Sequence, residues 1–366
     1  ILFTIPNFMT AGSGQALLNV AQRLDRTRFL PSICVLKRGG RLETEIAELG
    51  IPLIELPFAV PPRPLHVLPL RLWHAAQPFK PYRFALWHSY HYSDDYTEPL
   101  IARLSGARAW VYTKKNMGWG SRAWRLRTLL ATRIAAQNSA MLARFFHNNL
   151  NKVRLVPRGV DAEQFKPGTP PRLGLRNRLR IGSDTVLIGC VAHLLPVKGH
   201  PTLLHALVKV PDVHLVLAGR PLDQPYVDAL HTLAQELNVV ERTHFLDNVQ
   251  NIPALHAELD IFALPTLGRM RMEGCPVALL EAMSSGLPCI ATDIPGSQDV
   301  IEHERSGVLV PPEDIAALAN ALQRLVDSQA ERVRLGRAAR QRILDQYTIE
   351  REVAAHEALY AELLGV

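Results

Sequence analysis

The chain has 366 residues, of which 48% are hydrophobic, enough to fill two domains of ordinary size. No stretch approaches the ~18 uninterrupted apolar residues of a membrane span, and no basic-plus-apolar signal segment is present. These features argue against an integral membrane protein. The sequence starts inside an apolar run without an initiator Met, so we expect a trimmed N-terminus.

The cysteines are scattered, and none forms a Cys-x-x-Cys pair. We expect reduced core thiols and a cytoplasmic protein. They are Cys34, Cys190, Cys275 and Cys289.

Positive charge is concentrated in the first part of the chain. Residues 1–150 contain 19 Lys and Arg against 8 Asp and Glu, a net charge of +11, whereas the remainder carries −4. This asymmetry predicts an anionic partner such as a membrane surface, an acidic acceptor or nucleic acid. No recognisable nucleic-acid-binding module is present, which disfavours the last of these. The alternative is a solvated basic surface.

In chain order, short β-branched runs alternate with longer amphipathic stretches, the pattern of parallel α/β sheets. The first half contains helical stretches at 14–24 and 41–49. Its predicted strands are 2–6, 31–37, 52–56, 84–88, 109–113 and 153–157. The predicted strands of the second half are 185–192, 213–218, 243–246, 261–265, 288–292 and 307–310.

The tail from Ile315 is almost wholly helical, and a turn-rich segment at 157–171 is the predicted hinge. The pattern predicts an α/β protein of two doubly wound, Rossmann-like domains facing each other across a cleft. We place the first domain at 1–158 and the second at 159–345. A C-terminal helix at 346–366 is expected to cross back to the first domain.

Two loops of the sequence suit a phosphate-bearing ligand. Gly12 and Gly14 follow the first strand and open a helix, where small residues let a backbone approach a ligand closely; an ordinary tight turn is the alternative. Lys198, followed by Gly199, lies between a predicted strand and a helix. There a lysine can meet a diphosphate while the helix N-terminus adds backbone donors. A lysine on a surface turn is the alternative.

The most informative pair is Glu273 and Glu281, eight residues apart. Pro276 suits a first helical turn, the helix is predicted over 277–285, and Gly286 ends it. The two carboxylates therefore flank a helix N-terminus, which attracts phosphate. They can accept hydrogen bonds from hydroxyl groups on either side of a diphosphate, as in a nucleotide sugar. Alternatively, one caps the helix and the other is solvated.

The segments around these residues resemble glycosyltransferase family 4, most strongly over 186–314 and with weaker similarity along nearly the full length. The resemblance implies a GT-B fold and a retaining glycosyltransferase. Such an enzyme moves a sugar from a nucleotide-diphosphate sugar to a lipid-linked or saccharide acceptor in cell-surface glycan synthesis. It also implies an acceptor-side first domain and a donor-binding second domain.

By the same resemblance, Glu273 engages the sugar, Glu281 the ribose, and Lys198 the diphosphate together with the backbone of Gly274, Cys275, Pro276 and Val277. The family's Gly-rich first loop corresponds to Gly12 and Gly14. His88 resembles an acceptor-side histidine; a structural histidine is the alternative.

The sequence departs from the family at two positions. His193 stands where the family has an arginine beside the diphosphate, and a histidine is charged only when protonated. The family histidine after the fifth strand is missing. Lys114, Lys115 and Asn116 lie there, and we expect contacts with phosphate or acceptor, the alternative being a solvated loop. A sugar-nucleotide epimerase and a catalytically silent sugar-nucleotide binder remain alternative functions.

No metal ion or other cofactor is expected. No Asp-x-Asp follows a strand, no His/Cys cluster has zinc spacing, and Lys198 with helix dipoles can meet the diphosphate charge.

The segment from Trp119 to Ile134 combines arginines with Trp124 and leucines. Such a basic amphipathic stretch predicts peripheral attachment to the cytoplasmic membrane face, with a packed helix as the alternative.

Overall fold

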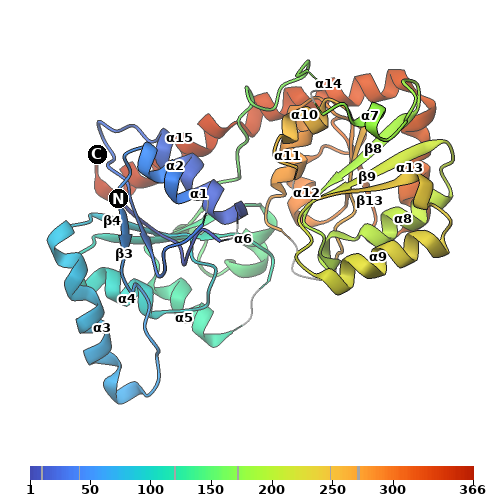
Figure 1. The fold of residues 1–366 in the computed structure, drawn as a ribbon. Coiled ribbons are helices and arrows are strands. Elements are labelled where there is room, and N and C mark those ends of the chain that lie inside the picture. The colour runs from blue at the N-terminus through green and yellow to red at the C-terminus, as the bar shows by residue number, and fades with distance from the viewer. Residues whose placement is uncertain (10, 41, 119–120, 171–172, 248, 270–272) are drawn as a thin grey trace. The chain divides into compact units, whose positions relative to one another are not determined.

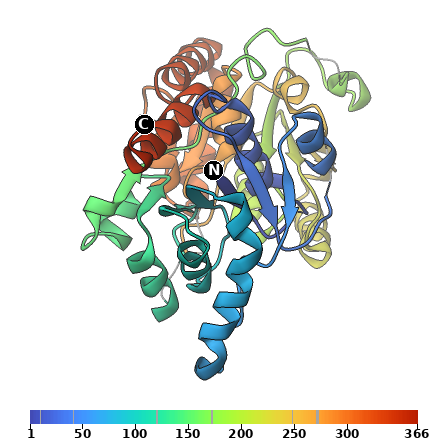
Figure 2. The ribbon, with the colours of Figure 1, turned by 90° about the vertical axis from the view of Figure 1, so that its left-hand side faces the viewer.

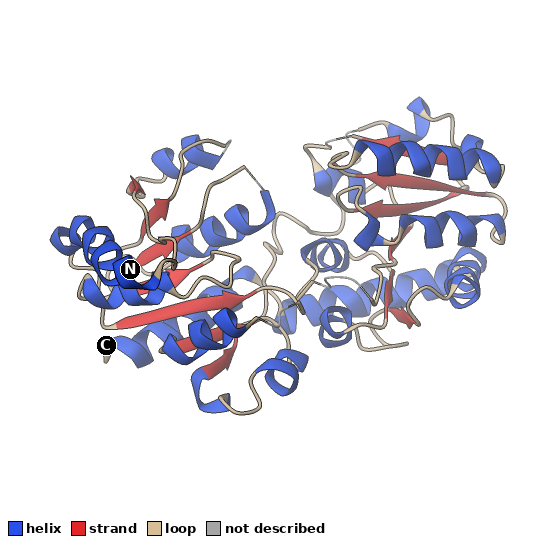
Figure 3. Ribbon diagram, turned by 90° about the horizontal axis from the view of Figure 1, so that it is seen from below, coloured by secondary structure: helices blue, strands red, loops and turns tan. Residues whose placement is uncertain are grey.

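The computed structural model describes residues 1–9, 11–40, 42–118, 121–170, 173–247, 249–269 and 273–366. The chain divides into two compact units, the first made of residues 1–157 and 349–366 and the second of residues 158–348. Figures 1 and 3 show a parallel sheet in each unit with helices on both of its faces.

Unit 1 contains a seven-stranded sheet in the order β3-β2-β1-β4-β5-β6-β7, in which every described pair is parallel. Its strands are β1 Leu2–Thr4, β2 Ser32–Val35, β3 Leu53–Glu55, β4 Leu86–Ser89, β5 Ala109–Lys114, β6 Arg133–Ala136 and β7 Val153–Leu155. Its helices are α1 Ala11–Arg23, α2 Leu42–Glu48, α3 Leu68–Ala76, α4 Thr97–Leu104, α5 Arg122–Leu130, α6 Ala140–Phe145 and α15 Ile349–Leu364. Short 3-10 turns are η1 Leu65–Val67, η2 Gln77–Tyr82 and η3 Leu150–Lys152.

Unit 2 contains a six-stranded parallel sheet in the order β10-β9-β8-β11-β12-β13. Its strands are β8 Val186–Val191, β9 Val213–Ala218, β10 Thr243–Leu246, β11 Ile261–Leu264, β12 Cys289–Thr292 and β13 Val308–Val310. Its helices are α7 Leu175–Arg178, α8 His200–Val208, α9 Gln224–Glu236, α10 Ile252–His256, α11 Val277–Ser284, α12 Pro295–Val300, α13 Ile315–Asp327 and α14 Gln329–Gln346. Its 3-10 turns are η4 Pro196–Lys198 and η5 Val240–Arg242.

The expected pair of doubly wound parallel sheets is therefore confirmed. Central strands such as β5 and β11 are buried along their whole length, which is why they read as nearly continuous apolar runs. The tail is helical as predicted, and its last helix, α15, belongs to unit 1, where it packs against α1. Within the described residues, we find no helix with the length and apolar composition that crossing a bilayer requires.

The segment around α5 differs from its prediction. The basic amphipathic stretch expected from Trp119 to Ile134 ends at Leu130, and β6, which was not predicted, begins at Arg133. Trp119 lies outside the described residues. Trp124 is buried, so it belongs to the core of unit 1 rather than to a lipid-facing surface.

Arg127, another residue of that stretch, is fully buried because it meets a buried counterion. Its Nη2 lies 3.0 Å from Oε2 of Glu98, and its guanidinium stacks 4.7 Å from the ring centroid of Trp110. Glu98 also accepts hydrogen bonds from Ser89 and Trp87. A buried ion pair with this many partners is structural, so Arg127 cannot contact a membrane.

Candidate functional site

The order of strands in unit 2 reverses between β8 and β11. In open parallel sheets, ligands bind beyond the carboxyl ends of the strands at such a reversal. The loop after β8 carries His193 and Lys198, and the loop after β11 carries Glu273. Three of the residues singled out from the sequence therefore gather at the place where the topology favours a ligand.

Lys198 and Glu273 form an ion pair across these two loops. The Lys198 ammonium donates to Oε1 of Glu273 at 2.8 Å. Only 11% of the lysine side chain is exposed, against 44% of the glutamate side chain. The lysine is thus held in one position, whereas Glu273 keeps enough free surface to contact a ligand.

Glycines let the elements of this site come close together. Gly199 has a φ of 69°, and a Cβ atom there would lie 1.9 Å from the carbonyl oxygen of Pro265 in the loop after β11. A Cβ atom at Gly296, in the first turn of α12, would lie 2.7 Å from the carbonyl oxygen of Glu273. Side chains at either position would push apart the loops that bring Lys198 and Glu273 together.

His193 lies in the electrostatic field of this pair. Burial lowers the pKa of its imidazole, and the charges of Lys198 and Arg220 lower it further, against an opposing effect of Glu273. The imidazole is therefore neutral near pH 7 without a ligand, and it does not replace the fixed charge of the arginine that the family resemblance implies.

Arg220 is a site residue that the sequence analysis missed. It follows β9, the strand next to β8, and its backbone carbonyl accepts a hydrogen bond from Leu194 at 3.0 Å. Its charge is close enough to His193 to shift the pKa of the histidine. The sequence did offer a signal for it, because Arg220 is a basic residue that directly follows the predicted strand 213–218 and Gly219.

Helix α11 supplies the backbone donors of the site. It begins at Val277, and Pro276 is its N-cap residue. The sequence predicted Pro276 inside the first turn, whereas in the structure the proline lies one position before that turn. In the part of the chain that the structure describes, no side chain caps this end. The amides of Leu279 and Leu280 donate to the carbonyl oxygen of Pro276, which leaves those of Val277 and Ala278 to a ligand. Gly286, with a φ of 79°, closes the helix as predicted.

Glu281 lies in the second turn of α11 and is half-buried. Burial raises the pKa of its carboxyl group to about 7. Near neutral pH the group is therefore partly protonated, and it can donate as well as accept a hydrogen bond. Such a group suits hydroxyl partners, which also do both.

The candidate residues of unit 1 fit their expected roles less well. Gly12 and Gly14 lie in the first turn of α1. A Cβ atom at Gly14 would lie 2.8 Å from the ring of Phe8, so packing within unit 1 accounts for this glycine, whereas nothing stands within 4 Å of a Cβ atom at Gly12.

His88 is fully buried in β4, with one ring nitrogen 2.6 Å from the Tyr360 hydroxyl and the other 2.9 Å from Oγ1 of Thr113. In this position the histidine ties β4 to β5 and α15, as the structural alternative expects, and its contact with an acceptor stays a prediction.

Lys114 is also fully buried and donates to the carbonyl oxygens of Asn116 and Gly118, so its contact with phosphate or acceptor likewise stays a prediction. Burial fixes it in the core of the loop after β5. Lys115, which donates to the Tyr90 carbonyl, and Asn116 are half-buried and are the residues of this group that remain near the surface.

Among the residues that the structure describes, no group of three or more His, Cys, Asp or Glu side chains could hold a metal ion.

The chain is similar to known proteins in both sequence and structure. Residues 173–342 match a family model described as Glycosyl transferases group 1. A GDP-mannose-dependent alpha-(1-6)-phosphatidylinositol monomannoside mannosyltransferase of Mycobacterium tuberculosis is 32% identical over 201 residues, which cover 52% of this chain and 51% of the relative. A UDP-Gal:alpha-D-GlcNAc-diphosphoundecaprenol alpha-1,3-galactosyltransferase of Escherichia coli is 28% identical, covering 58% of this chain and 55% of the relative. The matched part thus spans about half the length of these relatives.

Two solved structures cover nearly the whole chain. A glycosyltransferase from Rickettsia africae has a TM-score of 0.88 at 19% identity and covers 99% of this chain and 98% of its own. The Anabaena protein Alr3699/HepE, solved with UDP and glucose, has a TM-score of 0.82 at 19% identity and covers 99% of both chains. At these identities the likeness establishes the fold.

Proposed function

We propose that the chain is a retaining glycosyltransferase; residues 173–342 match the group 1 glycosyl transferases, and the fold is GT-B. In this proposal it moves a sugar from a nucleotide-diphosphate sugar to a lipid-linked or saccharide acceptor in cell-surface glycan synthesis. The names of the mycobacterial and Escherichia coli relatives, which specify nucleotide sugars and lipid-borne acceptors, support this reading. Residues 159–345 take the donor, and residues 1–158 face the acceptor.

The observation that carries the proposal is the Lys198–Glu273 pair at the strand reversal of unit 2, together with the uncapped N-terminus of α11. A diphosphate bound there meets the lysine ammonium and the backbone of Gly274–Val277, in which Gly274, Cys275 and Val277 carry N–H groups and Pro276 does not. Glu273 contacts the sugar on one side and Glu281 the ribose on the other. Because lysine has three N–H donors, it can hold Glu273 and a phosphate oxygen at the same time.

Arg220 compensates in this proposal for the histidine at position 193. Its charge already acts on His193. A bound diphosphate would raise the pKa of the imidazole and favour its charged form. Lys198, Arg220 and His193 then stabilise the charge on the leaving group.

The transfer breaks the bond between the anomeric carbon and the β-phosphate oxygen and forms a bond from that carbon to the acceptor hydroxyl oxygen. The acceptor proton passes to the leaving phosphate, so no protein nucleophile is needed. Positioning of the reactants and stabilisation of developing charge are the main tasks of the residues named above.

A screen of UDP-, GDP- and ADP-sugars by thermal shift tests donor binding. We expect one of these nucleotide sugars to raise the melting temperature of the wild-type protein, because a ligand that binds only the folded state stabilises it. Lys198→Ala is expected to weaken that binding by about 1.5–3 kcal/mol, the range for a charge-assisted hydrogen bond. Lys209→Ala, which removes an exposed lysine after α8, is the matched control. Binding that is unchanged in Lys198→Ala would remove the lysine from the donor site.

We also propose that the reaction needs no metal ion, because protein groups meet the diphosphate charge. Activity in excess chelator is expected to equal activity with added Mg²⁺. The measurement is the initial rate of nucleotide diphosphate release with the donor found by the screen. Activity lost in chelator and restored by Mg²⁺ or Mn²⁺ would contradict this part of the proposal.

Product analysis separates transfer from its alternatives. Incubation with donor alone gives an epimerised nucleotide sugar if the protein is an epimerase, because that reaction needs no acceptor. A silent binder would give the thermal shift but no product with any acceptor.

We also propose that the protein acts on the cytoplasmic side, with peripheral attachment to an anionic membrane face.

A further inference from the structure

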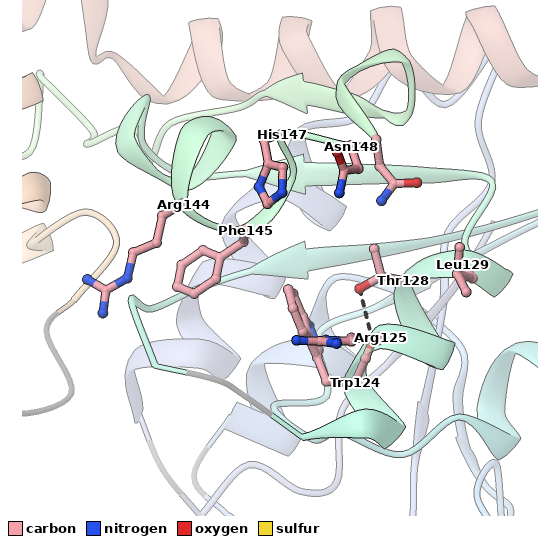
Figure 4. A pocket seen from close by; sticks show the side chains of 9 residues that line it. Trp124, Arg125, Thr128, Leu129, Arg144, Phe145, His147 and Asn148 are labelled. Carbon is pink, nitrogen blue, oxygen red and sulfur yellow. Dashed lines mark hydrogen bonds between the residues drawn. The ribbon is translucent and has the colours of Figure 1, made fainter.

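A groove of about 700 Å³ lies in unit 1 between α5 and the turn that follows α6, and it opens to solvent. Figure 4 shows side chains from both segments facing the same space, with the ring of Phe145 above Trp124 and with His147 and Asn148 on the far side from α5. Its lining residues are Trp124, Arg125, Thr128, Leu129, Arg144, Phe145, His147, Asn148 and Asn149.

The groove is basic in its lining residues. Arg125, Arg144 and His147 line it, and no acidic side chain among the described residues does. The sequence contains no Asp or Glu between Glu98 and Asp161, a stretch that contains 12 Lys and Arg. A positive potential in the groove is therefore not cancelled by neighbouring residues along the chain.

The two guanidinium groups of the groove differ from those of Arg133 and Arg154, which share one counterion. Arg133 and Arg154 both pair with Glu362, at 2.6 and 2.8 Å. In the described part of the chain, Arg125 and Arg144 form no ion pair. Burial lowers the pKa of the nearby Lys114 to about 7, and the charge of Arg144 adds to this effect. An anion in the groove would thus meet two cations that the protein itself leaves without counterions.

Hydrogen-bond donors and apolar side chains accompany these cations. Asn148 and Asn149 add side-chain amides to the groove. Leu129 lines it and is 59% exposed, Leu126 lies on the same exposed face of α5, and Leu150 follows Asn149 and is 53% exposed. Cations and amides beside exposed leucines match a molecule with a phosphate group at the end of an aliphatic chain.

We propose that this groove binds the phosphate of an anionic phospholipid head group and docks unit 1 on a bilayer surface. This inference rests on the membrane attachment given with the proposed function. It moves the lipid-contacting surface from the stretch predicted between Trp119 and Ile134 to the groove. Arg127 is fully buried and takes no part in lipid contact, and the largely buried Trp124 only lines the groove. Arg125, Arg144 and the exposed leucines make the contact. Because the groove contains no residue of the donor site, docking needs neither nucleotide sugar nor transfer.

The test is co-sedimentation of the full chain with lipid vesicles at low salt. We compare vesicles of equal parts phosphatidylglycerol and phosphatidylcholine with vesicles of phosphatidylcholine alone. The groove variant is Arg125→Ser/Arg144→Ser. The matched control is Arg26→Ser/Arg108→Ser, which removes the same charge from two exposed residues of unit 1 outside the groove. Thermal unfolding and the nucleotide-sugar shift of each variant establish that both units are intact.

The wild type is expected to bind the anionic vesicles only. The groove variant should bind them about 10- to 30-fold more weakly, as for two basic residues at an anionic surface, and the control less than about 3-fold more weakly. Equal weakening of vesicle binding in the two variants would show that binding depends only on the overall positive charge of unit 1, and it would overturn the proposal. A wild-type protein that does not bind anionic vesicles would overturn it as well.

Two further arms identify the source of the phosphate and the docking surface. Millimolar inorganic phosphate, at constant ionic strength, is expected not to release the protein from vesicles; release would assign the groove to a soluble phosphate and overturn lipid binding.

Helix α3 extends away from the sheet of unit 1 and exposes Leu70 and Trp73. If Leu70→Ser/Trp73→Ser abolishes vesicle binding while the groove variant retains it, α3 is the docking surface and the groove is not. None of these outcomes depends on sugar transfer, so failure here leaves the proposed function standing.

Discussion

Replacing Arg127 by alanine is expected to destabilise unit 1 by about 3–5 kcal/mol, the usual cost of removing one partner of a buried ion pair. The guanidinium lies 3.0 Å from the Glu98 carboxylate, and both side chains are fully buried. Among the described residues, its loss leaves the buried Glu98 carboxylate with no counterion in contact. All five tryptophans of the chain lie within residues 1–124. Tryptophan fluorescence during urea unfolding therefore reports on unit 1 and measures the change directly.

Arg122→Ala is the matched control, because Arg122 lies exposed at the start of the same helix. Its effect is expected to stay within about 0.5 kcal/mol, as for most surface substitutions. The double variant Glu98→Gln/Arg127→Met should recover part of the lost stability, since it removes both charges. An Arg127→Ala protein within about 1 kcal/mol of wild type would show that the pair does not hold unit 1 together.

Glu273→Ala is expected to lower kcat by about 100-fold or more, a size typical of a lost contact that stabilises the transition state. In the proposed function this carboxylate contacts the sugar as positive charge develops on it, and it also holds Lys198 at 2.8 Å. The measurement is steady-state kinetics with the donor identified by thermal shift. Wild-type turnover in Glu273→Ala would show that the assignment is wrong.

Glu281→Ala is the internal comparison for this experiment. A contact with ribose acts equally in the ground state and the transition state, so its loss should mainly raise KM for the donor and leave kcat nearly unchanged. The two glutamates lie on either side of the N-terminus of α11, one before it and one in its second turn. If both variants lose kcat to the same extent, the separate roles of the two carboxylates are contradicted.

Local patterns located most elements of the fold. The predicted strands at Val213–Ala218 and Thr243–Leu246 agree with β9 and β10 to the residue, because apolar runs between turn signals are decided locally. Strand β6 at Arg133–Ala136 was missed because half of its residues are alanines and it follows an arginine-rich helix with few turn residues between them. Its strand conformation comes from pairing with β5 and β7.

Local sequence patterns were enough to predict the two doubly wound sheets, the loops that carry Lys198 and Glu273, and the helix that begins after Pro276. Periodicity, glycines and prolines act over a few residues, and they are visible in a linear chain. The resemblance to one family rested on the same short segments.

Which side chains meet and which are exposed could not be predicted from local patterns, because both depend on how the chain packs. The pairing of Lys198 with Glu273 spans 75 residues and depends on β8 and β11 lying next to each other. Burial of His88 and Arg127 likewise depends on partners far along the chain, since burial is a property of the whole packed domain. A charged or aromatic residue in a promising pattern is therefore assigned to surface or core only by the packing around it.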